Sequence, residues 1–167
     1  ESREEILKNI DAYTGIIIRS RITIDAEFLS AAKNLKFIGR VGAGLESIDV
    51  DLALERGILL FSAPEGNRDA VGEHTIGMLL SLLHKLTIAN KEVKAGQWAR
   101  ESNRGTELGY KTIGLIGYGN MGKAFAKRLS GFGCKVICHD ILPNMGDENA
   151  AQVSLEQLQK EANVLSL

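Results

Sequence analysis

The segment Gly117-Tyr118-Gly119-Asn120-Met121-Gly122 constrains the fold more than any other part of this 167-residue chain. It follows an apolar run that predicts a strand over 112–116, and it opens a predicted helix over 121–131. A second strand, predicted over 135–139, ends at Asp140. A G-x-G-x-x-G pattern is weak by itself, but between a strand and a helix it is typical of a βαβ unit. The sequence therefore predicts an α/β fold with parallel sheets and crossover helices.

Each part of this motif has a physical role in holding a dinucleotide. Gly117 permits a tight turn, Gly119 lets the backbone approach a pyrophosphate, and Gly122 lets the helix pack closely on the strand. The free N–H groups and the positive end of the helix dipole face the phosphates. Asp140 lies eighteen residues after Gly122, where its carboxylate can accept hydrogen bonds from ribose hydroxyls. The alternative is a structural glycine turn with an incidental surface aspartate.

The residues after Asp140 favour NAD over NADP as the cofactor. No Lys or Arg occurs in 141–146. A ribose 2′-phosphate would therefore meet the Asp140 carboxylate without a compensating cation.

The N-terminal part alternates strands with helices in the same way. Strands are predicted over 16–18, 35–41 and 58–61, with Asp25 and Asp49 as helix N-caps between them. The crossovers should be right-handed. The continuous apolar run at 16–18 suits a strand that is covered on both faces. Because this sheet has only three strands and the sequence opens on a helical pattern, a preceding strand is expected.

A turn cluster at 64–67 predicts the boundary between a lobe over 1–66 and a lobe over 67–167. One long helix is predicted over about 70–95, with an apolar stripe at helical spacing that ends at Gly96.

The polar segment 97–108, which follows that helix, carries the only tryptophan, Trp98. Such an arm suits a partner surface. An ordinary loop pinned by Trp98 on its own core is an equal alternative.

Composition excludes several classes of protein. The net charge is −1 and the cations are dispersed among acids, which argues against nucleic-acid binding. No apolar run is long enough to cross a bilayer, and the charged start lacks a secretory pattern. Cys134 and Cys138 have no second pair to complete a metal site, so we expect no metal and two thiols in a reducing compartment, the cytoplasm.

Short stretches spread over nearly the whole chain match one family in the same order. They are Ile18–Ser20, Gly39–Gly44, Ile48-Asp49, Gly57-Ile58, Ala63-Pro64, Gly66-Asn67, Gly96–Trp98, Gly105–Leu108 and Ile113–Gly122, with Val136 and Asp140 at the expected spacing. On these residues the sequence resembles the D-isomer-specific 2-hydroxyacid dehydrogenases, and among them the D-3-phosphoglycerate dehydrogenases.

The resemblance implies a subunit with two domains and an active site in the cleft between them. Residues 1–66 would be the N-terminal part of a flavodoxin-like substrate-binding domain. Residues 67–167 would be the first half of a Rossmann NAD-binding domain, incomplete at its C-terminal end.

The resemblance also assigns roles to individual residues. A loop would present backbone N–H groups to the substrate carboxylate; its residues are Val41, Gly42, Ala43 and Gly44. Ala43 would also approach the cofactor. Arg19 and Arg40 match positions near a substrate phosphate, although an ion pair at the strand end is an equal alternative for Arg19.

The resemblance also implies that the matched positions of the second lobe would contact the cofactor. Asn120 and Met121 would meet the pyrophosphate through their backbone, and Asp140 would bind the ribose. Tyr110 departs from the family, because relatives usually have glycine there; this should alter a turn but not the chemistry.

The implied activity is NAD-dependent hydride transfer at the CH–OH group of a D-2-hydroxy acid, with 3-phosphoglycerate favoured. The family's catalytic Arg, Glu and His are expected beyond this sequence, so no catalytic residue is assigned and the chain itself is expected to be inactive. A non-catalytic NAD-sensing regulator of the same family is the alternative. A homodimer through the long helix and the Trp98 arm is also implied.

Overall fold

The computed structural model describes residues 2–167. These residues form two compact units, unit 1 ending at Asn67 and unit 2 spanning Arg68–Leu167. The boundary lies at the end of the turn cluster predicted as a hinge. Within the described residues, no helix combines the length and the apolar character needed to span a membrane.

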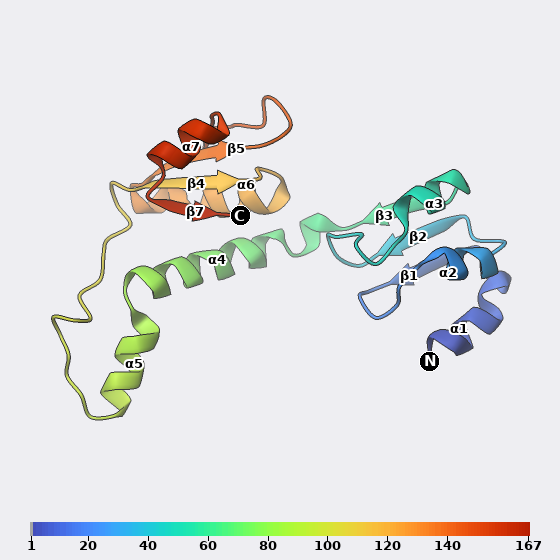
Figure 1. Cartoon of the computed structure of the whole chain (residues 1–167), viewed down its shortest axis with the longest axis horizontal. Helices are drawn as coiled ribbons and strands as arrows, with labels where there is room; N and C mark the ends of the chain where they lie inside the picture. The colour runs from blue at the N-terminus through green and yellow to red at the C-terminus, as the bar shows by residue number, and fades with distance from the viewer. Residues whose placement is uncertain (1) are drawn as a thin grey trace. The chain divides into compact units, whose positions relative to one another are not determined.

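Unit 1 is a three-stranded parallel sheet in the order β1-β2-β3 (Figure 1). Asp25 and Asp49 cap α2 and α3 as predicted, accepting the N–H groups of Phe28 at 3.0 Å and Leu52 at 3.1 Å. The elements of unit 1 are α1 (Arg3–Asn9), the 3₁₀ turn η1 (Ile10–Ala12), β1 (Gly15–Ile18), α2 (Ala26–Ala31), β2 (Phe37–Arg40), α3 (Val50–Glu55), β3 (Leu59–Ser62) and η2 (Pro64–Gly66).

Only one face of the unit 1 sheet is covered. Ile18 and Ile38 point into a core built with the helices, whereas Ile17, Leu59 and Phe61 on the opposite face are 75%, 60% and 57% exposed. The expectation that the β1 run is covered on both faces is therefore wrong for the described chain. The reason is topological: successive right-handed crossovers that add strands in one direction place their helices on one side.

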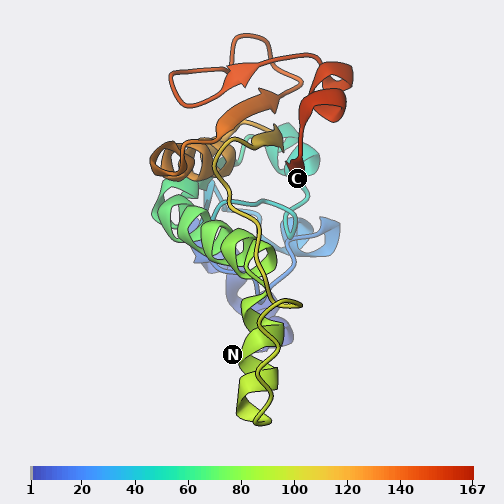
Figure 2. The same cartoon turned by 90° about the vertical axis from the view of Figure 1, so that its left-hand side faces the viewer.

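Unit 2 is a four-stranded parallel sheet in the order β6-β5-β4-β7. Helices α4 and α6 pack on one face, through Leu79, Phe125 and Leu129, and α7 packs on the other, through Leu158 (Figures 1 and 2). The elements are α4 (Arg68–Leu83), α5 (Leu86–Lys94), β4 (Thr112–Ile116), α6 (Asn120–Leu129), the 3₁₀ turn η3 (Ser130–Phe132), β5 (Lys135–His139), β6 (Ala151–Gln152), α7 (Leu155–Glu161) and β7 (Val164–Ser166).

The single long helix predicted over 70–95 is wrong, because the chain breaks between α4 and α5. Lys85 adopts a left-handed backbone with φ 54°. The carbonyl of Leu83 accepts the N–H of Thr106 at 2.9 Å, and Lys85 Nζ donates to the carbonyl of Ser102 at 2.7 Å. A returning segment thus takes a carbonyl that a continuous helix would use.

The predicted apolar stripe of this helix is also only partly buried. Leu79 is 7% exposed, but Met78 and Leu82 are 56% and 74% exposed. The buried line of α4 runs through Gly72, where an added Cβ would lie 2.9 Å from the carbonyl oxygen of Ala124 in α6. The glycine therefore sets the close approach of the two helices.

Tyr110 occupies a turn that favours glycine. Its φ is 63° and its side chain is 99% exposed, so the side chain gains no packing in exchange for the left-handed backbone. Tyr110 therefore adopts a backbone conformation that glycine reaches more easily, at a cost in conformational strain.

Replacing Tyr110 by glycine should therefore stabilise the protein. We expect Tyr110→Gly to raise the free energy of unfolding by about 0.5–1 kcal/mol, because glycine removes the Cβ clash of the left-handed region. Tyr110→Ala, which keeps the Cβ, serves as the control and should give no such gain. Urea unfolding measures both variants, and equal gains would contradict this explanation.

Candidate functional site

The glycine turn between β4 and α6 disfavours side chains at two positions, at Gly117 because of its backbone conformation and at Gly122 because of a close contact. Gly117 has φ 94°, and a Cβ on Gly122 would lie 2.5 Å from the carbonyl oxygen of Gly117. Gly119 is the N-cap of α6, and an added Cβ there would meet nothing within 4 Å. The first N–H groups of α6, including those of Asn120 and Met121, therefore begin a helix whose N-cap has no side chain to pair with them.

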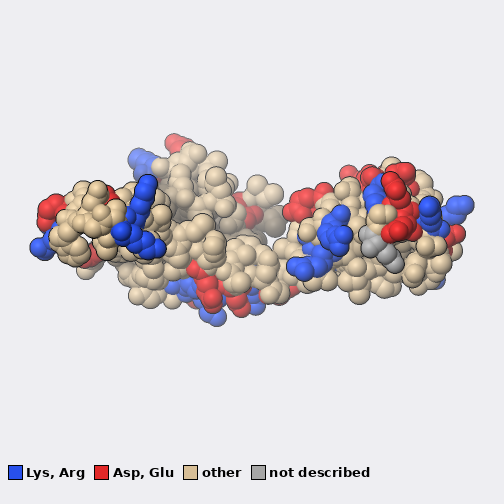
Figure 3. Space-filling view, turned by 90° about the horizontal axis from the view of Figure 1, so that it is seen from below, with Lys and Arg blue, Asp and Glu red and all other residues tan. Residues whose placement is uncertain are grey.

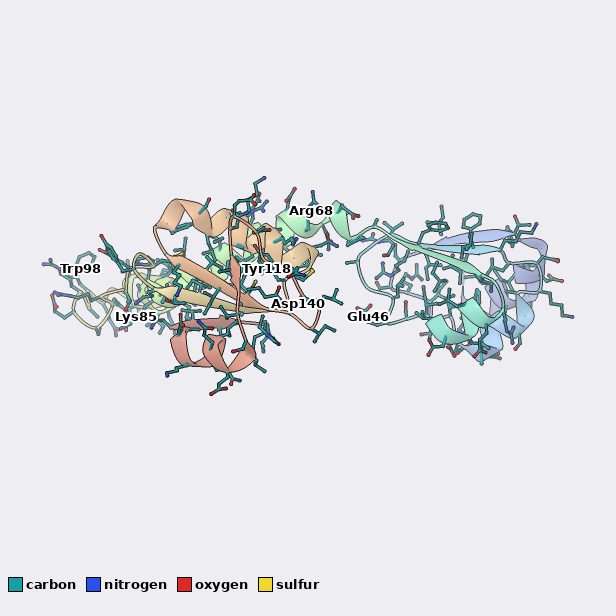
Figure 4. All side chains as sticks on the ribbon, turned by 90° about the horizontal axis from the view of Figure 1, so that it is seen from above. Glu46, Arg68, Lys85, Trp98, Tyr118 and Asp140 are labelled. Atoms are coloured by element: carbon teal, nitrogen blue, oxygen red, sulfur yellow. The ribbon has the colours of Figure 1, made fainter. Side chains whose placement is uncertain are left out.

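Asp140 lies directly against this turn (Figure 4). It follows β5, whose last residue pairs in register with the last residue of β4. Its Oδ2 accepts the N–H of Tyr118 at 2.7 Å, and its Oδ1 accepts the N–H of Leu142 at 3.0 Å. These two hydrogen bonds, that from Leu142 first, hold the pKa of Asp140 below its usual value.

The turn also lies where the strand order reverses. β4 has β5 on one side and β7 on the other, while α6 and α7 cover opposite faces. The carboxyl end of a strand at such a switch point is where open α/β sheets bind ligands.

Sequence reasoning missed the role of Tyr118. Its side chain is fully buried and its hydroxyl donates to Asp147 Oδ1 at 2.6 Å. Lys123 Nζ lies 5.6 Å from the centre of the Tyr118 ring and 3.9 Å from Asp147 Oδ2. A tyrosine inside the glycine motif could have signalled a buried hydroxyl that needs a hydrogen-bond partner. The sequence does not identify Asp147 as that partner.

The loop predicted to bind the substrate carboxylate follows β2 in unit 1. Val41 is not a free donor, because its N–H donates to the carbonyl of Ile18 at 2.9 Å. Within residues 2–167, the N–H groups of Gly42, Ala43 and Gly44 donate to no protein acceptor. The Glu46 carboxylate (Figure 4) lies over Gly44, so that an added Cβ would overlap it.

The two predicted arginines behave differently. Arg40, the last residue of β2, folds its guanidinium onto its own loop: Nη1 donates to the carbonyl of Val41 and would lie 2.5 Å from a Cβ on Gly42. Its Nε is buried and lacks a partner among the described residues. Arg19 is exposed, and no carboxylate in the described part of the chain pairs with it. The described residues therefore offer no ion pair in support of that alternative for Arg19.

The structure thus brings together two sets of predicted residues, each within its own unit. In unit 1 the strand ends of β1 and β2 carry Arg19, Arg40, Val41, Gly42, Ala43 and Gly44. In unit 2 the ends of β4 and β5 carry Gly117, Gly119, Asn120, Met121, Gly122 and Asp140.

The segment after α5 is an exposed arm. Trp98 is 83% exposed, so the alternative in which it is pinned on its own core is wrong. α5 has no buried residue, and Leu86, Ile88 and Val93 are each more than half exposed. Figures 1 and 2 show α5 and this arm extending away from the unit 2 sheet.

Comparison with known proteins identifies the family. Residues 1–163 match the model of the D-isomer specific 2-hydroxyacid dehydrogenase catalytic domain. The chain belongs to this dehydrogenase family. The prediction made from its matched stretches, and the α/β fold with a Rossmann-like unit, are confirmed.

Individual relatives in the dehydrogenase family carry several names. The chain is 40% identical to D-3-phosphoglycerate dehydrogenase of Archaeoglobus fulgidus, over 93% of this chain and 29% of that protein. It is 36% identical to hydroxypyruvate reductase of Thermotoga maritima, over 99% of this chain and 54% of that protein. The chain therefore spans between about a third and a half of the length of these relatives.

A solved structure gives the same family. D-lactate dehydrogenase of Aquifex aeolicus, in complex with NAD and lactic acid, superposes with a TM-score of 0.87 at 29% identity, over 96% of this chain and 49% of that one.

The surface charge of the dehydrogenase chain is mixed. On the face in Figure 3, Lys and Arg alternate with Asp and Glu instead of forming one basic stripe.

The two cysteines carry free thiols, Cys134 half-buried and Cys138 buried, and burial raises the pKa of both.

The lowered pKa of Asp140 predicts a pH dependence. In the folded protein the Asp140 carboxyl should titrate below the ordinary aspartate value of 3.8. The ionised carboxylate therefore contributes fully to the free energy of unfolding above that pH, and this contribution is lost as the pH falls through the folded pKa. Asp140→Asn should therefore show a shallower loss of stability below about pH 4. Carboxyl ¹³C titration and urea unfolding over a pH series test this. A folded midpoint at or above 3.8 would contradict it.

Proposed function

We propose that the protein is an NAD-dependent oxidoreductase acting on the CH–OH group of a D-2-hydroxy acid. The observation that carries this proposal is the Asp140 carboxylate held by the backbone of the glycine turn. An ionised acceptor beside a helix N-terminus offers complementary charges to the ribose hydroxyls and the pyrophosphate of one dinucleotide.

The residues of unit 2 fit NAD. The missing Cβ atoms at Gly117 and Gly122 allow a tight turn, Gly119 leaves open space, and the first N–H groups of α6 can donate to phosphate oxygens. When bound, NAD supplies the hydride acceptor or donor at its nicotinamide. The role of this chain's residues is to bind and orient the adenosine and pyrophosphate.

NAD is favoured over NADP for an electrostatic reason. Asp140 stays ionised, since its hydrogen bonds lower its pKa, and 141–146 contain no cation to pair with a 2′-phosphate. A phosphate at the 2′ position would therefore face a carboxylate.

The loop of unit 1 is suited to an anionic substrate. In the described part of the chain, three consecutive N–H groups, those of Gly42, Ala43 and Gly44, have no protein acceptor and could bind a carboxylate. Arg19 offers an unpaired guanidinium at the same edge of the sheet, because β1 and β2 are parallel and in register there. A second anionic group, as in 3-phosphoglycerate, would match this cation, and a relative at 40% identity is named for that substrate.

Cofactor binding tests the proposal directly. We expect the chain to bind NADH, and Asp140→Asn to weaken binding about tenfold, because a hydrogen bond to a charged group is lost. The preference for NADH over NADPH should shrink in the same variant.

The matched control is Glu156→Gln, the same change of charge on the exposed first turn of α7. This variant should bind NADH like the unmodified chain. Fluorescence titration measures all three proteins. Equal NADH affinity in Asp140→Asn and the unmodified chain would exclude Asp140 as the ribose acceptor.

We also propose that the arm forms a homodimer contact. An amphipathic helix with no buried residue, followed by an exposed tryptophan, is a surface whose apolar side chains lack a partner within their own unit. Aromatic residues of this kind are enriched at the centres of protein interfaces.

Trp98→Ala should weaken this association. Loss of a central tryptophan costs about 2 kcal/mol, which corresponds to roughly a thirtyfold rise in the dimer Kd. Tyr110→Ala removes another exposed aromatic of the same unit and should leave the Kd unchanged. Sedimentation equilibrium measures both variants, and equal effects would argue against an interface centred on the arm.

A further inference from the structure

Among the described residues, Tyr118 alone donates hydrogen bonds to the carboxylates at both ends of the loop after β5. Its backbone N–H donates to Asp140 Oδ2 at 2.7 Å, where the loop begins. Its hydroxyl donates to Asp147 Oδ1 at 2.6 Å, near the end of the loop. Residues seven positions apart are thereby tied to a single residue inside the glycine turn.

The bond between the Tyr118 hydroxyl and Asp147 lies in a protected place. The tyrosine is fully buried, and the Asp147 side chain is 24% exposed. Burial, and then the hydrogen bond to Asp147, raise the pKa of Tyr118 above its usual range, so the hydroxyl remains a donor. Although partial burial acts to raise the pKa of Asp147, the hydrogen bonds from Tyr118 and Asn149 lower it overall, so it remains a charged acceptor.

Asp147 in turn organises the end of the loop. Its Oδ1 also accepts the N–H of Asn149 at 2.9 Å, and its own N–H donates to the carbonyl of Ala150 at 3.1 Å. At the other end, the Asp140 carboxylate accepts the N–H of Leu142. The middle of the loop is held separately by Gln152, which accepts the N–H of Met145 at 2.6 Å and donates to the carbonyl of Leu142 at 2.8 Å. Without the tyrosine hydroxyl, the loop would keep its contacts with the glycine turn and α6 through Asp140 and through the 3.9 Å ion pair of Asp147 with Lys123.

We propose that Tyr118 is a positioning residue for the adenosine half of the cofactor: through Asp147 it fixes the loop 141–149 and so holds Asp140 against the glycine turn. This inference rests on the proposed function. Tyr118 contacts Asp140 through its backbone, so the side chain acts by keeping the loop in place and not by touching the ribose.

Binding of ADP-ribose tests the inference, because this probe carries the adenosine and pyrophosphate but no nicotinamide. Tyr118→Phe, which removes only the hydroxyl, should weaken ADP-ribose binding about fivefold. Asp147→Ala should weaken it similarly. The double variant should be no weaker than Asp147→Ala, since both changes remove the same bond. Calorimetric titration gives the affinities, and amide hydrogen exchange over 141–149 should be faster in each variant.

Asn163→Ala is the control for general loss of stability. The Asn163 side chain accepts the N–H of Thr112 at 2.9 Å. Thr112 begins β4, so this bond lies at the amino end of the strand, away from the glycine turn at its carboxyl end. This variant should lower the thermal midpoint while leaving ADP-ribose affinity unchanged. If Tyr118→Phe folds poorly, the less buried Asp147→Ala carries the comparison.

Each contrary outcome has a distinct meaning. If Asp140→Asn weakens ADP-ribose binding and neither Tyr118→Phe nor Asp147→Ala does, the positioning role is wrong while the proposed function stands. If Asn163→Ala weakens binding as much as Tyr118→Phe, the effect is one of stability and the positioning role is again wrong. If the unmodified chain does not bind ADP-ribose, the proposed function and this inference both fail.

Discussion

The rest of unit 2 depends on the steric limit at the turn from β4 to α6. Gly122 approaches the carbonyl oxygen of Gly117 so closely that a Cβ would lie 2.5 Å away. This contact lets α6 begin directly above the strand, and α6 then packs Phe125 and Leu129 into the core. The same close turn leaves the first N–H groups of the helix open to an anion. The absence of a side chain at Gly122 thus determines both the packing of α6 and the position of its first N–H groups.

Features with local causes could be predicted from the sequence. β4 and β5 begin and end at the predicted residues, because each is an apolar run bounded by turn residues. Asp140 could be placed at the glycine turn because the carboxyl ends of neighbouring parallel strands meet at one edge. The N-caps at Asp25 and Asp49 depend only on a short side chain three residues before an N–H group.

Features with distant causes could not be predicted. The break after Leu83 depends on Thr106, which lies far along the chain. The bond from Tyr118 to Asp147 spans 29 residues, and neither residue type signals the other. Helical periodicity was also misleading in α4: Met78 and Leu82 continue the apolar pattern but lie on the exposed side, while a glycine marks the packed side. Periodicity indicates that a face is apolar, but it does not identify what covers that face.

Each of the two units places a glycine-containing loop at the carboxyl end of a parallel strand. In unit 2 the donors follow β4, and in unit 1 they follow β2, the central strand of its sheet. In both places glycine permits a positive φ, 94° at Gly117 and 146° at Gly42. The side chains that support the two loops differ. Arg40 packs against Gly42 of its own loop, whereas the Tyr118 hydroxyl donates to Asp147 in a separate loop. The Arg40 guanidinium lies against Val41 and Gly42. Under the proposed function it would therefore favour anion binding by shaping the loop and by placing a positive charge nearby. Arg19 has no such contact among the described residues, so under the proposed function it is the arginine that would meet a second anionic group.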